Sequence, residues 1–233
     1  SGRAGRDGKS SFCWIILSDE APKQINAALA PDASDATIAE AANAKAGDAH
    51  RILWLHRNTY RGVKAEIDTT LKVYKDFFAS EFKGVLPGFA LSFPVDFADA
   101  GVGSEMQKQQ QMERDKGLHR LALLGIVKDY SLDYRSKQFE VTAQIVTDEE
   151  LIHGLQDYVG RYKMSDRVRA IPLEIDAQEG DSFLSKCLSL LVSFVYTEIE
   201  RKRRVALFTM LEVARHAGKL ATPFDQDLYI RQE

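Results

Sequence analysis

The chain has 233 residues, of which 45% are hydrophobic and 28% are charged. This composition excludes the disordered and collagen-like classes, and the longest apolar runs fall short of the roughly 20 residues that a membrane-spanning helix needs. We therefore expect no membrane partner. The formal net charge is -3, so any nucleic-acid surface must be a local basic patch. The length predicts one large domain or two to three small ones.

The two cysteines, Cys13 and Cys187, both stand in apolar surroundings. Two thiols this far apart in the sequence are typical of buried free cysteines in a reducing compartment, which predicts a cytoplasmic protein. They also cannot form a four-thiolate zinc site. The five histidines are scattered, and none has a second ligand at metal-binding spacing, so the sequence predicts no metal site.

The beginning of the chain combines a glycine- and arginine-rich run, residues 1–9, with a short apolar stretch, Phe12–Leu17. The apolar stretch has the pattern of a strand that is buried on both faces of a sheet. One strand cannot form a sheet alone, so we expect its partners upstream and expect the chain to be an excerpt of a longer protein. Residues 1–30 are accordingly predicted to be the end of a larger α/β domain.

Residues 31–85 predict a helical hairpin. Asp35 is placed to cap a helix, and Asp48 is placed to cap the next one. Apolar residues then recur at helical spacing from residue 52 to residue 78, with a break at Arg61–Gly62. From 82 to 103 the chain is rich in Gly, Pro, Phe and small residues, which predicts a linker or extended segment and a domain boundary near residue 86.

Residues 86–146 carry the clearest local pattern. A polar helical stretch, 105–116, is followed by a more apolar helix, 118–124, which ends at Gly125. Two alternating runs, 126–134 and 139–146, are joined by Arg135-Ser-Lys-Gln138 and predict a β-hairpin. A helix pair that leads into a hairpin is the order of a winged helix.

Residues 147–233 predict a C-terminal helical region that is truncated. Thr147 caps a helix, an irregular region around Pro172 follows, and 181–217 forms a long helix or a kinked pair. A last helix begins after Pro223 and stops at the end of the chain. The predicted fold class is therefore mostly α with an α/β remnant.

The chemistry of the first residues suggests phosphate binding. Three glycines, at 2, 5 and 8, would let the backbone approach a ligand, and the guanidinium groups of Arg3 and Arg6 bind phosphate oxygens in pairs. The alternative is a solvated turn or an expression scar. A P-loop is excluded, because Gly8-Lys9-Ser10 would require glycine where Arg3 stands, and because this loop leads into a strand instead of a helix.

The run Ser1-Gly-Arg-Ala-Gly-Arg-Asp-Gly8 before an apolar strand resembles motif VI of RecQ-like superfamily-2 DNA helicases. The stretch Leu118-His-Arg-Leu-Ala-Leu-Leu-Gly-Ile-Val-Lys-Asp-Tyr130, with Asp133-Tyr134 after it, is similar to the winged helix of a bacterial RecQ-like group. The resemblance implies that residues 1–30 end the second RecA-like lobe. It also implies an ATP-dependent DNA helicase that acts in DNA repair and recombination.

The resemblance further implies a role for each residue of the motif. Arg6 would be the arginine finger at the γ-phosphate, Arg3 would be its partner, and Asp7 would orient one of these arginines. ATP with Mg²⁺ would be contacted by Gly2, Arg3, Gly5, Arg6 and Asp7, and bound mainly by upstream parts of the protein. A fixed guanidinium stabilises the charge that develops in phosphoryl transfer. Without a P-loop, this part of the chain alone is expected to be inactive.

One departure from the family concerns zinc. RecQ proteins typically carry a four-cysteine zinc module after motif VI, whereas this chain has no cysteine between Cys13 and Cys187. The sequence therefore predicts no bound zinc, and either a zinc-free branch of the family or a resemblance to the broader superfamily.

For DNA, both single-stranded and at a duplex junction, the expected contacts are basic residues of the winged helix, which are phosphate contacts in kind: Lys108, Arg114, Lys116, Arg120, Arg135 and Lys137. An aromatic residue that stacks on a base would have to be Tyr130 or Tyr134, although cross-strand packing is the more common role. The basic run 201–204 is interpreted as a solvated helix face, with a DNA contact as the alternative. The rival hypothesis is a non-enzymatic winged-helix module that binds DNA or a protein, and the oligomeric state stays open.

Overall fold

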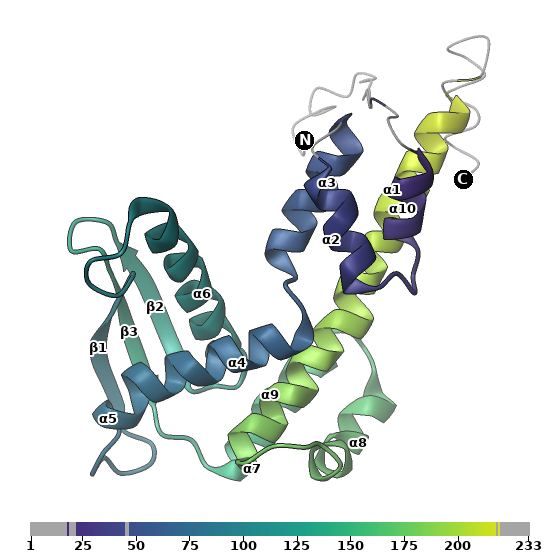
Figure 1. Cartoon of the computed structure of the whole chain (residues 1–233). Helices are drawn as coiled ribbons and strands as arrows, with labels where there is room; N and C mark the ends of the chain where they lie inside the picture. Colours follow the sequence, from purple (N-terminus) through teal and green to yellow (C-terminus); the bar gives the residue numbers. More distant parts are fainter. Residues whose placement is uncertain (1–17, 19–21, 45–46, 218, 220–233) are drawn as a thin grey trace, which may run out of the picture. The chain divides into compact units, whose positions relative to one another are not determined.

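The computed structural model describes residues 18, 22–44, 47–217 and 219 (Figure 1). The chain forms two compact units. One, which we call the terminal unit, comprises Ser1–Tyr60 and Glu198–Glu233, and the other, the central unit, comprises Arg61–Thr197. The described residues are mostly helical, with one three-stranded antiparallel sheet, so the prediction of a mostly α fold with a small β part is confirmed.

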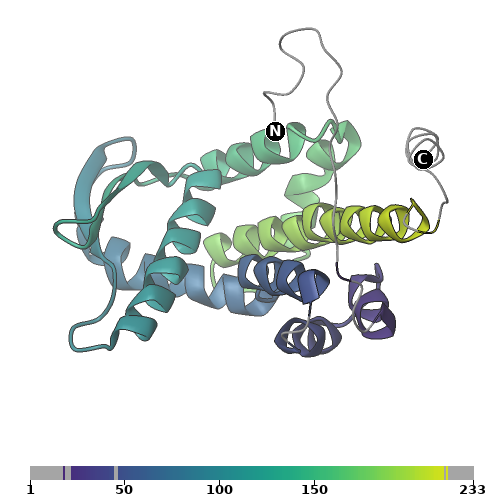
Figure 2. The ribbon, with the colours of Figure 1, turned by 90° about the horizontal axis from the view of Figure 1, so that it is seen from above.

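The terminal unit is helical in its described residues. Helices α1 (Pro22–Leu29), α2 (Asp35–Asn43) and α3 (Gly47–Thr59) lie along one side of α10 (Arg201–Ala217), as Figure 2 shows from above. One apolar cluster joins all four helices: Ile25, Ala28, Leu29, Ala41, Ala42, Ala49, Leu53 and Leu211. Half of these side chains are alanine and half are leucine or isoleucine, and residues from both ends of the chain complete one core.

Polar residues fix where the helices of this unit begin. Helix α2 is capped by Ser34, whose hydroxyl accepts a hydrogen bond from the Thr37 amide at 3.2 Å, while Asp35 is the first helical residue. Asp48 lies in the first turn of α3 and exchanges two bonds with Ser18. The Ser18 amide donates to Asp48 Oδ2 at 3.2 Å, and the Asp48 amide donates to Ser18 Oγ at 3.1 Å. Such bonds satisfy amides that a helix start leaves without a partner.

In the central unit, α4 (Val63–Val73) continues into a π-helical turn, Tyr74–Phe78, and the short α5 (Ala79–Glu81). The predicted break before this helix is confirmed, because Gly62 has a φ of 108°, a conformation that favours glycine. Phe78 is fully buried and makes edge-to-face contacts with Phe82 and Phe93, at 5.8 and 5.0 Å between ring centroids. These aromatic contacts join the helix to the sheet.

The sheet has the order β1-β3-β2, with strands β1 (Ala90–Asp96), β2 (Val127–Asp133) and β3 (Gln138–Gln144). The hairpin of β2 and β3 is confirmed. Of the two alternatives for residues 82–103, a linker or an extended segment, β1 is the extended one, and it belongs to the sheet because it pairs fully with β3, from Ala90↔Gln144 to Asp96↔Gln138. Its Pro94 is tolerated because β1 is an edge strand. Phe93 and Val95 alternate inward, opposite Val141 and Phe139.

Helix α6 (Ser104–Leu123) packs against α4 and β2. It is one helix of 20 residues, where the sequence had suggested a pair joined near Gly117. Gly117 lies inside the helix, at a position where Val73 of α4 leaves no room for a side chain. A Cβ at this position would lie 2.9 Å from Cγ2 of Val73. The glycine therefore allows close packing of α4 and α6 and does not end a helix.

The remaining helices of the central unit are α7 (Asp148–Gly160), α8 (Ser165–Asp176) and α9 (Phe183–Phe194), after which the π-helical segment Val195–Glu200 leads into α10. Thr147 and Glu150 form a reciprocal capping box, which confirms the predicted start of α7. The expectation of an irregular region around Pro172 is wrong, because Pro172 lies inside α8. The Val168 carbonyl, which the proline leaves without its helical donor, accepts a bond from Gln156 Nε2 at 3.4 Å.

The two units divide the chain differently from the ranges expected from sequence. The expected boundaries near 86 and 147 both fall inside the central unit, and the expected first and last segments, 1–30 and 147–233, both contribute to the terminal unit. The strand predicted at 12–17 and the helix predicted after Pro223 lie outside the described residues. In the described residues, no helix is both long and apolar enough to cross a membrane.

Candidate nucleic-acid interface

The turn between β2 and β3 presents an aromatic ring and two cations. Tyr134 is 77% exposed, and Arg135 and Lys137 beside it are exposed. Neither cation forms an ion pair with any residue that the structure describes. Guanidinium and ammonium groups bind phosphates, and an exposed aromatic ring can stack on a base. The turn therefore combines the two kinds of contact that a nucleic-acid end requires.

Asp133 holds this turn in one shape. Its Oδ1 accepts a hydrogen bond from the Arg135 amide at 2.8 Å, and its Oδ2 accepts one from the Ser136 hydroxyl at 2.7 Å. These bonds, first that of Ser136 and then that of Arg135, lower the pKa of Asp133 below its usual value. Lys137 has a φ of 58°, and its carbonyl accepts a bond from the Phe97 amide at 3.0 Å. The turn is thus held at both ends, by Asp133 on the β2 side and by the bond between Phe97 and Lys137 on the β3 side.

The ring of Tyr134 packs against another aromatic ring, that of Phe97. It meets the buried Phe97 edge to face, with 6.5 Å between the centroids, and Phe97 packs on Phe139 at 5.5 Å. Tyr130, the other aromatic considered from sequence, has a different environment. It packs on Phe139 at 6.2 Å, and its hydroxyl bonds to Asp115. Burial, followed by the charge of Asp115, raises the pKa of Tyr130 to about 12. Tyr130 is therefore a packing residue, and Tyr134 is the exposed one.

Two arginines expected to contact DNA, Arg114 and Arg120, are buried inside the central unit. Arg114 donates to the Phe97 carbonyl at 2.6 Å and to Asp99 Oδ1 at 2.7 Å, and its guanidinium lies 5.3 Å from the Phe77 ring centroid. These contacts hold the segment after β1 against α6. The two arginines connect elements of the fold and present no exposed cation to a phosphate.

Arg120 and Lys116 share the carboxylate of Glu66, which extends from α4 and is also buried. Arg120 Nη2 lies 3.3 Å from each carboxylate oxygen, and Lys116 Nζ lies 2.9 Å from Oε1. Burial lowers the pKa of Lys116, an effect that Glu66 opposes. Lys108, the remaining candidate on α6, is exposed and paired with Glu105 at 3.1 Å. Of the six expected contacts, Arg135 and Lys137 are exposed and unpaired within the described residues.

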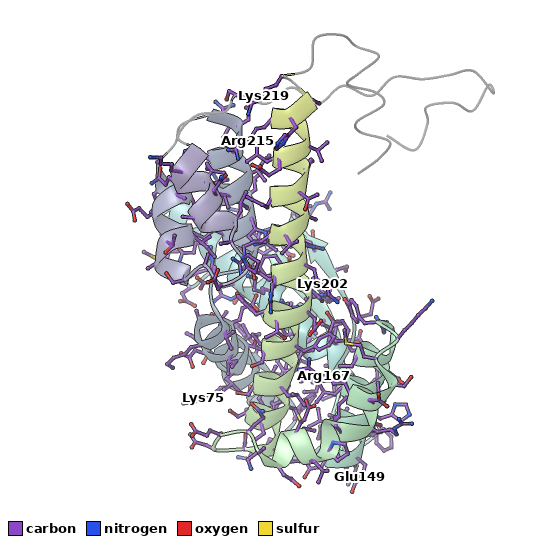
Figure 3. The ribbon with its side chains drawn as sticks, turned by 90° about the vertical axis from the view of Figure 1, so that its right-hand side faces the viewer. Lys75, Glu149, Arg167, Lys202, Arg215 and Lys219 are labelled. Carbon is purple, nitrogen blue, oxygen red and sulfur yellow. The ribbon has the colours of Figure 1, made fainter. Side chains whose placement is uncertain are left out.

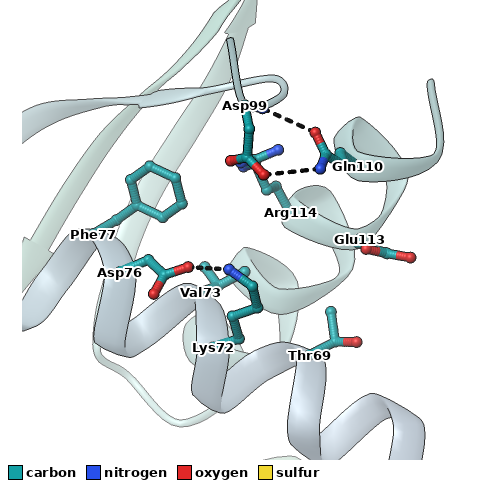
Figure 4. A pocket seen from close by; sticks show the side chains of 9 residues that line it. All are labelled: Thr69, Lys72, Val73, Asp76, Phe77, Asp99, Gln110, Glu113 and Arg114. Atoms are coloured by element: carbon teal, nitrogen blue, oxygen red, sulfur yellow. Dashed lines mark hydrogen bonds and ion pairs between the residues drawn. The ribbon is translucent and has the colours of Figure 1, made fainter. Parts of the chain in front are cut away.

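A small cavity of about 60 Å³ opens between α4 and α6 (Figure 4). Its charged groups bind one another. Lys72 pairs with Asp76, and Gln110 exchanges two bonds with Asp99, both at 2.9 Å. A cavity of this size holds water molecules and no nucleotide, so we assign no binding function to it.

The basic run 201–204, which begins α10, is mostly engaged within the terminal unit. Lys202, labelled in Figure 3, pairs with Glu198 at 3.1 Å. Arg204 is buried, pairs with Glu200, and donates to the carbonyls of Ala30 and Pro31. Glu200 also bonds to the buried His56 at 3.0 Å. The interpretation of this run as a solvated face therefore holds for Lys202 and not for Arg204.

The residues of the expected ATP contact, Gly2, Arg3, Gly5, Arg6 and Asp7, lie outside the described residues, so their role stays a prediction. Within the part of the chain that the structure describes, no three His, Cys, Asp or Glu side chains gather as a metal site. Searches of protein-family models, of curated proteins and of solved structures gave no match to this chain.

Proposed function

We propose that the chain is the C-terminal part of an ATP-dependent DNA helicase, and that its central unit binds DNA through the turn between β2 and β3. The observation that carries the DNA-binding part is the exposed Tyr134 between a supporting Phe97 and the unpaired cations Arg135 and Lys137. The helicase part rests on the resemblance of residues 1–8 to motif VI.

The order of elements in the central unit supports a winged helix. Helix α4, strand β1, helix α6 and the β2–β3 hairpin follow one another, and β1 pairs with the second strand of the hairpin. In this arrangement the hairpin is the wing, and Tyr134 is at its tip. We propose that the ring stacks on the exposed base pair at a duplex end or junction, while Arg135 and Lys137 bind the flanking phosphates.

In the helicase, Arg6 acts as the arginine finger at the γ-phosphate of ATP, with Arg3 as its partner, and the ATP is bound with Mg²⁺ mainly by upstream parts. The finger couples hydrolysis to movement, because it reaches the nucleotide only when two lobes close. In the full-length protein, Arg6→Ala should abolish DNA-stimulated ATP hydrolysis and leave nucleotide binding mostly intact. Unchanged turnover would refute the assignment.

A second candidate is a protein-binding adaptor, and α6 favours it. Met106 and Met112 are 57% and 47% exposed on this helix, and exposed methionines are common at protein-binding surfaces. The acids Glu105 and Asp115 are also exposed there, which opposes binding of the helix to a phosphate backbone.

Fluorescence anisotropy with a forked DNA distinguishes the two functions. The double variant Arg135→Gln/Lys137→Gln should lower the slope of log K against log salt concentration by about 2, because two phosphate contacts are lost. Tyr134→Ala should weaken fork binding about 5- to 100-fold, whereas Tyr134→Phe should bind almost normally.

The matched control for these measurements is Lys64→Gln/Arg169→Gln, which removes the same net charge from two exposed residues of the same unit. If the turn variants bind the fork as tightly as this control does, the turn is not a DNA contact and the adaptor function is favoured.

A further inference from the structure

The outer face of α3 carries large apolar side chains that are not buried among the residues that the structure describes. Trp54 is 51% exposed and Leu55 is 60% exposed, and both stand beside the exposed Arg51 at helical spacings of three and four residues. Arg57 is exposed one turn further along. Together, Arg51, Trp54, Leu55 and Arg57 form what we call the α3 surface.

In the described part of the chain, α3 packs through its other face. Ala49 and Leu53 belong to the apolar cluster of the terminal unit, and His56 is buried against Glu200. Trp54 makes no aromatic contact with another described residue. Exposed tryptophan side chains leave a large apolar area in water, so a surface that carries one beside an exposed leucine indicates a binding site.

The charges of the α3 surface are also free. Neither Arg51 nor Arg57 forms an ion pair with a residue in the described ranges, although most exposed lysines and arginines of α4, α6 and α8 do: Lys64, Lys72, Lys108 and Arg169. The one acid of α3, Asp48, lies in the first turn and bonds to Ser18. The surface is therefore aromatic and positively charged, without an acid of its own helix to neutralise it.

We propose that the α3 surface binds single-stranded nucleic acid, with a base stacked on Trp54 and phosphates bound by Arg51 and Arg57. The two arginines are six residues apart, which is about 9 Å along a helix, and Trp54 lies midway between them. A nucleotide likewise has its base between two phosphates. Stacking on an aromatic ring and ion pairs with the backbone are the two contacts that bind single strands without regard to sequence.

A protein partner fits this surface less well. Stable protein interfaces bury more than about 1,000 Å², with a mainly apolar centre. Here the apolar part consists of two side chains, and charged guanidinium groups lie on both sides of the indole. This site is separate from the β2–β3 turn in sequence and in the unit that carries it, so each site can fail without the other.

The test uses Trp54 itself as the reporter. The chain has two tryptophans, Trp14 and Trp54, so Trp14→Phe leaves Trp54 as the single indole. Addition of an oligothymidylate of about 12 nucleotides should quench its fluorescence, because a stacked base quenches an indole directly. The quenching should persist in a Tyr134→Ala background, which separates this site from the turn. Binding by the unmodified chain is followed in parallel by fluorescence anisotropy of the labelled oligonucleotide.

Substitutions then assign the contacts. Trp54→Ala should weaken oligothymidylate binding about 5- to 100-fold, and Trp54→Phe should restore most of the affinity, because phenylalanine still stacks. Arg51→Gln/Arg57→Gln should lower the slope of log K against log salt concentration by about 1.4, because two phosphate contacts to a single strand are lost. The control Lys23→Gln/Arg201→Gln removes two exposed cations of the same unit from α1 and α10 and should leave the affinity within about two-fold of wild type.

Unfolding curves check that each variant is folded. The proposal is overturned if the oligonucleotide leaves Trp54 fluorescence unchanged, or if Trp54→Ala binds as tightly as the wild type. It is also overturned if sedimentation shows a dimer that Trp54→Ala dissociates and that the oligonucleotide does not affect, because the surface would then join two copies of the chain.

Discussion

Removal of the buried charge at Glu66 should destabilise the central unit strongly. The side chain of Glu66 is 1% exposed and is the carboxylate partner of both Lys116, at 2.9 Å, and Arg120, at 3.3 Å. In Glu66→Gln, the amide keeps one acceptor oxygen but turns a donor group toward two cations. Loss of one partner from a buried ion pair costs about 3 to 5 kcal/mol.

The expected loss is somewhat smaller than that range. Lys116 is 20% exposed and so keeps partial contact with water, and burial already lowers its pKa. Arg120 has no such contact with water because it is buried, and its guanidinium group stays charged. We therefore expect a fall of about 2 to 4 kcal/mol in the free energy of unfolding.

Urea unfolding followed by circular dichroism measures this value, and the m-value should stay unchanged. The control Lys64→Gln removes one partner of an exposed pair, Lys64 with Asp68, and should cost less than about 0.5 kcal/mol. A double-mutant cycle with Arg120→Met should give a coupling of at least about 1 kcal/mol. The reasoning is refuted if Glu66→Gln costs no more than Lys64→Gln, or if the cycle shows no coupling.

Two further changes test local features of the central unit. Thr147→Ala breaks the capping box with Glu150 and should cost about 1 kcal/mol in urea unfolding, whereas Thr209→Ala, in the middle of α10, should cost nothing; equal effects would exclude a specific cap. Asp133→Asn should speed hydrogen exchange of the Arg135 amide. Because the pKa of Asp133 is lowered below 3.8, its contribution is present above about pH 4 and is lost as the pH falls further. Wild-type exchange at this amide should therefore rise toward that of the variant below about pH 4, and a wild-type rate that does not approach the variant's under acid conditions would contradict the role of the carboxylate.

The elements that the sequence predicts correctly are those specified by neighbouring residues. The hairpin has alternation in both strands and a turn of polar residues, and α7 has a cap three residues before its acidic partner. The place of β1 in the sheet was missed because Pro94 and the surrounding glycines are typical of loops, and only pairing with β3, more than forty residues away, makes this extended segment a strand of the sheet. Helix α8 was missed because a distant side chain, Gln156, satisfies the carbonyl that Pro172 leaves free.

The candidate site shows the same division. Arg135 and Lys137 were predicted as exposed contacts and are exposed, because turn residues of a hairpin face water. Arg114 and Arg120 were expected to contact DNA because guanidinium groups bind phosphates. Helical spacing indicates that Arg114 is buried, since it stands three and four residues before Gly117 and Leu118, on the buried face of α6. The carboxylates that pair with these arginines, Asp99 and Glu66, come from outside α6, so helix periodicity alone does not reveal the ion pairs.

The discontinuity of the terminal unit also governs when each part of the protein can fold during synthesis. All residues of the central unit leave the ribosome before α10 does, so that unit can close its sheet and its helix packing at once. Helices α1 to α3 emerge before the central unit and yet cannot complete their packing until later, because Leu211 and Arg204, on which it depends, are made about 150 residues after Leu53. During that interval their apolar faces are available to chaperones, and a protein truncated before residue 200 would keep them exposed permanently.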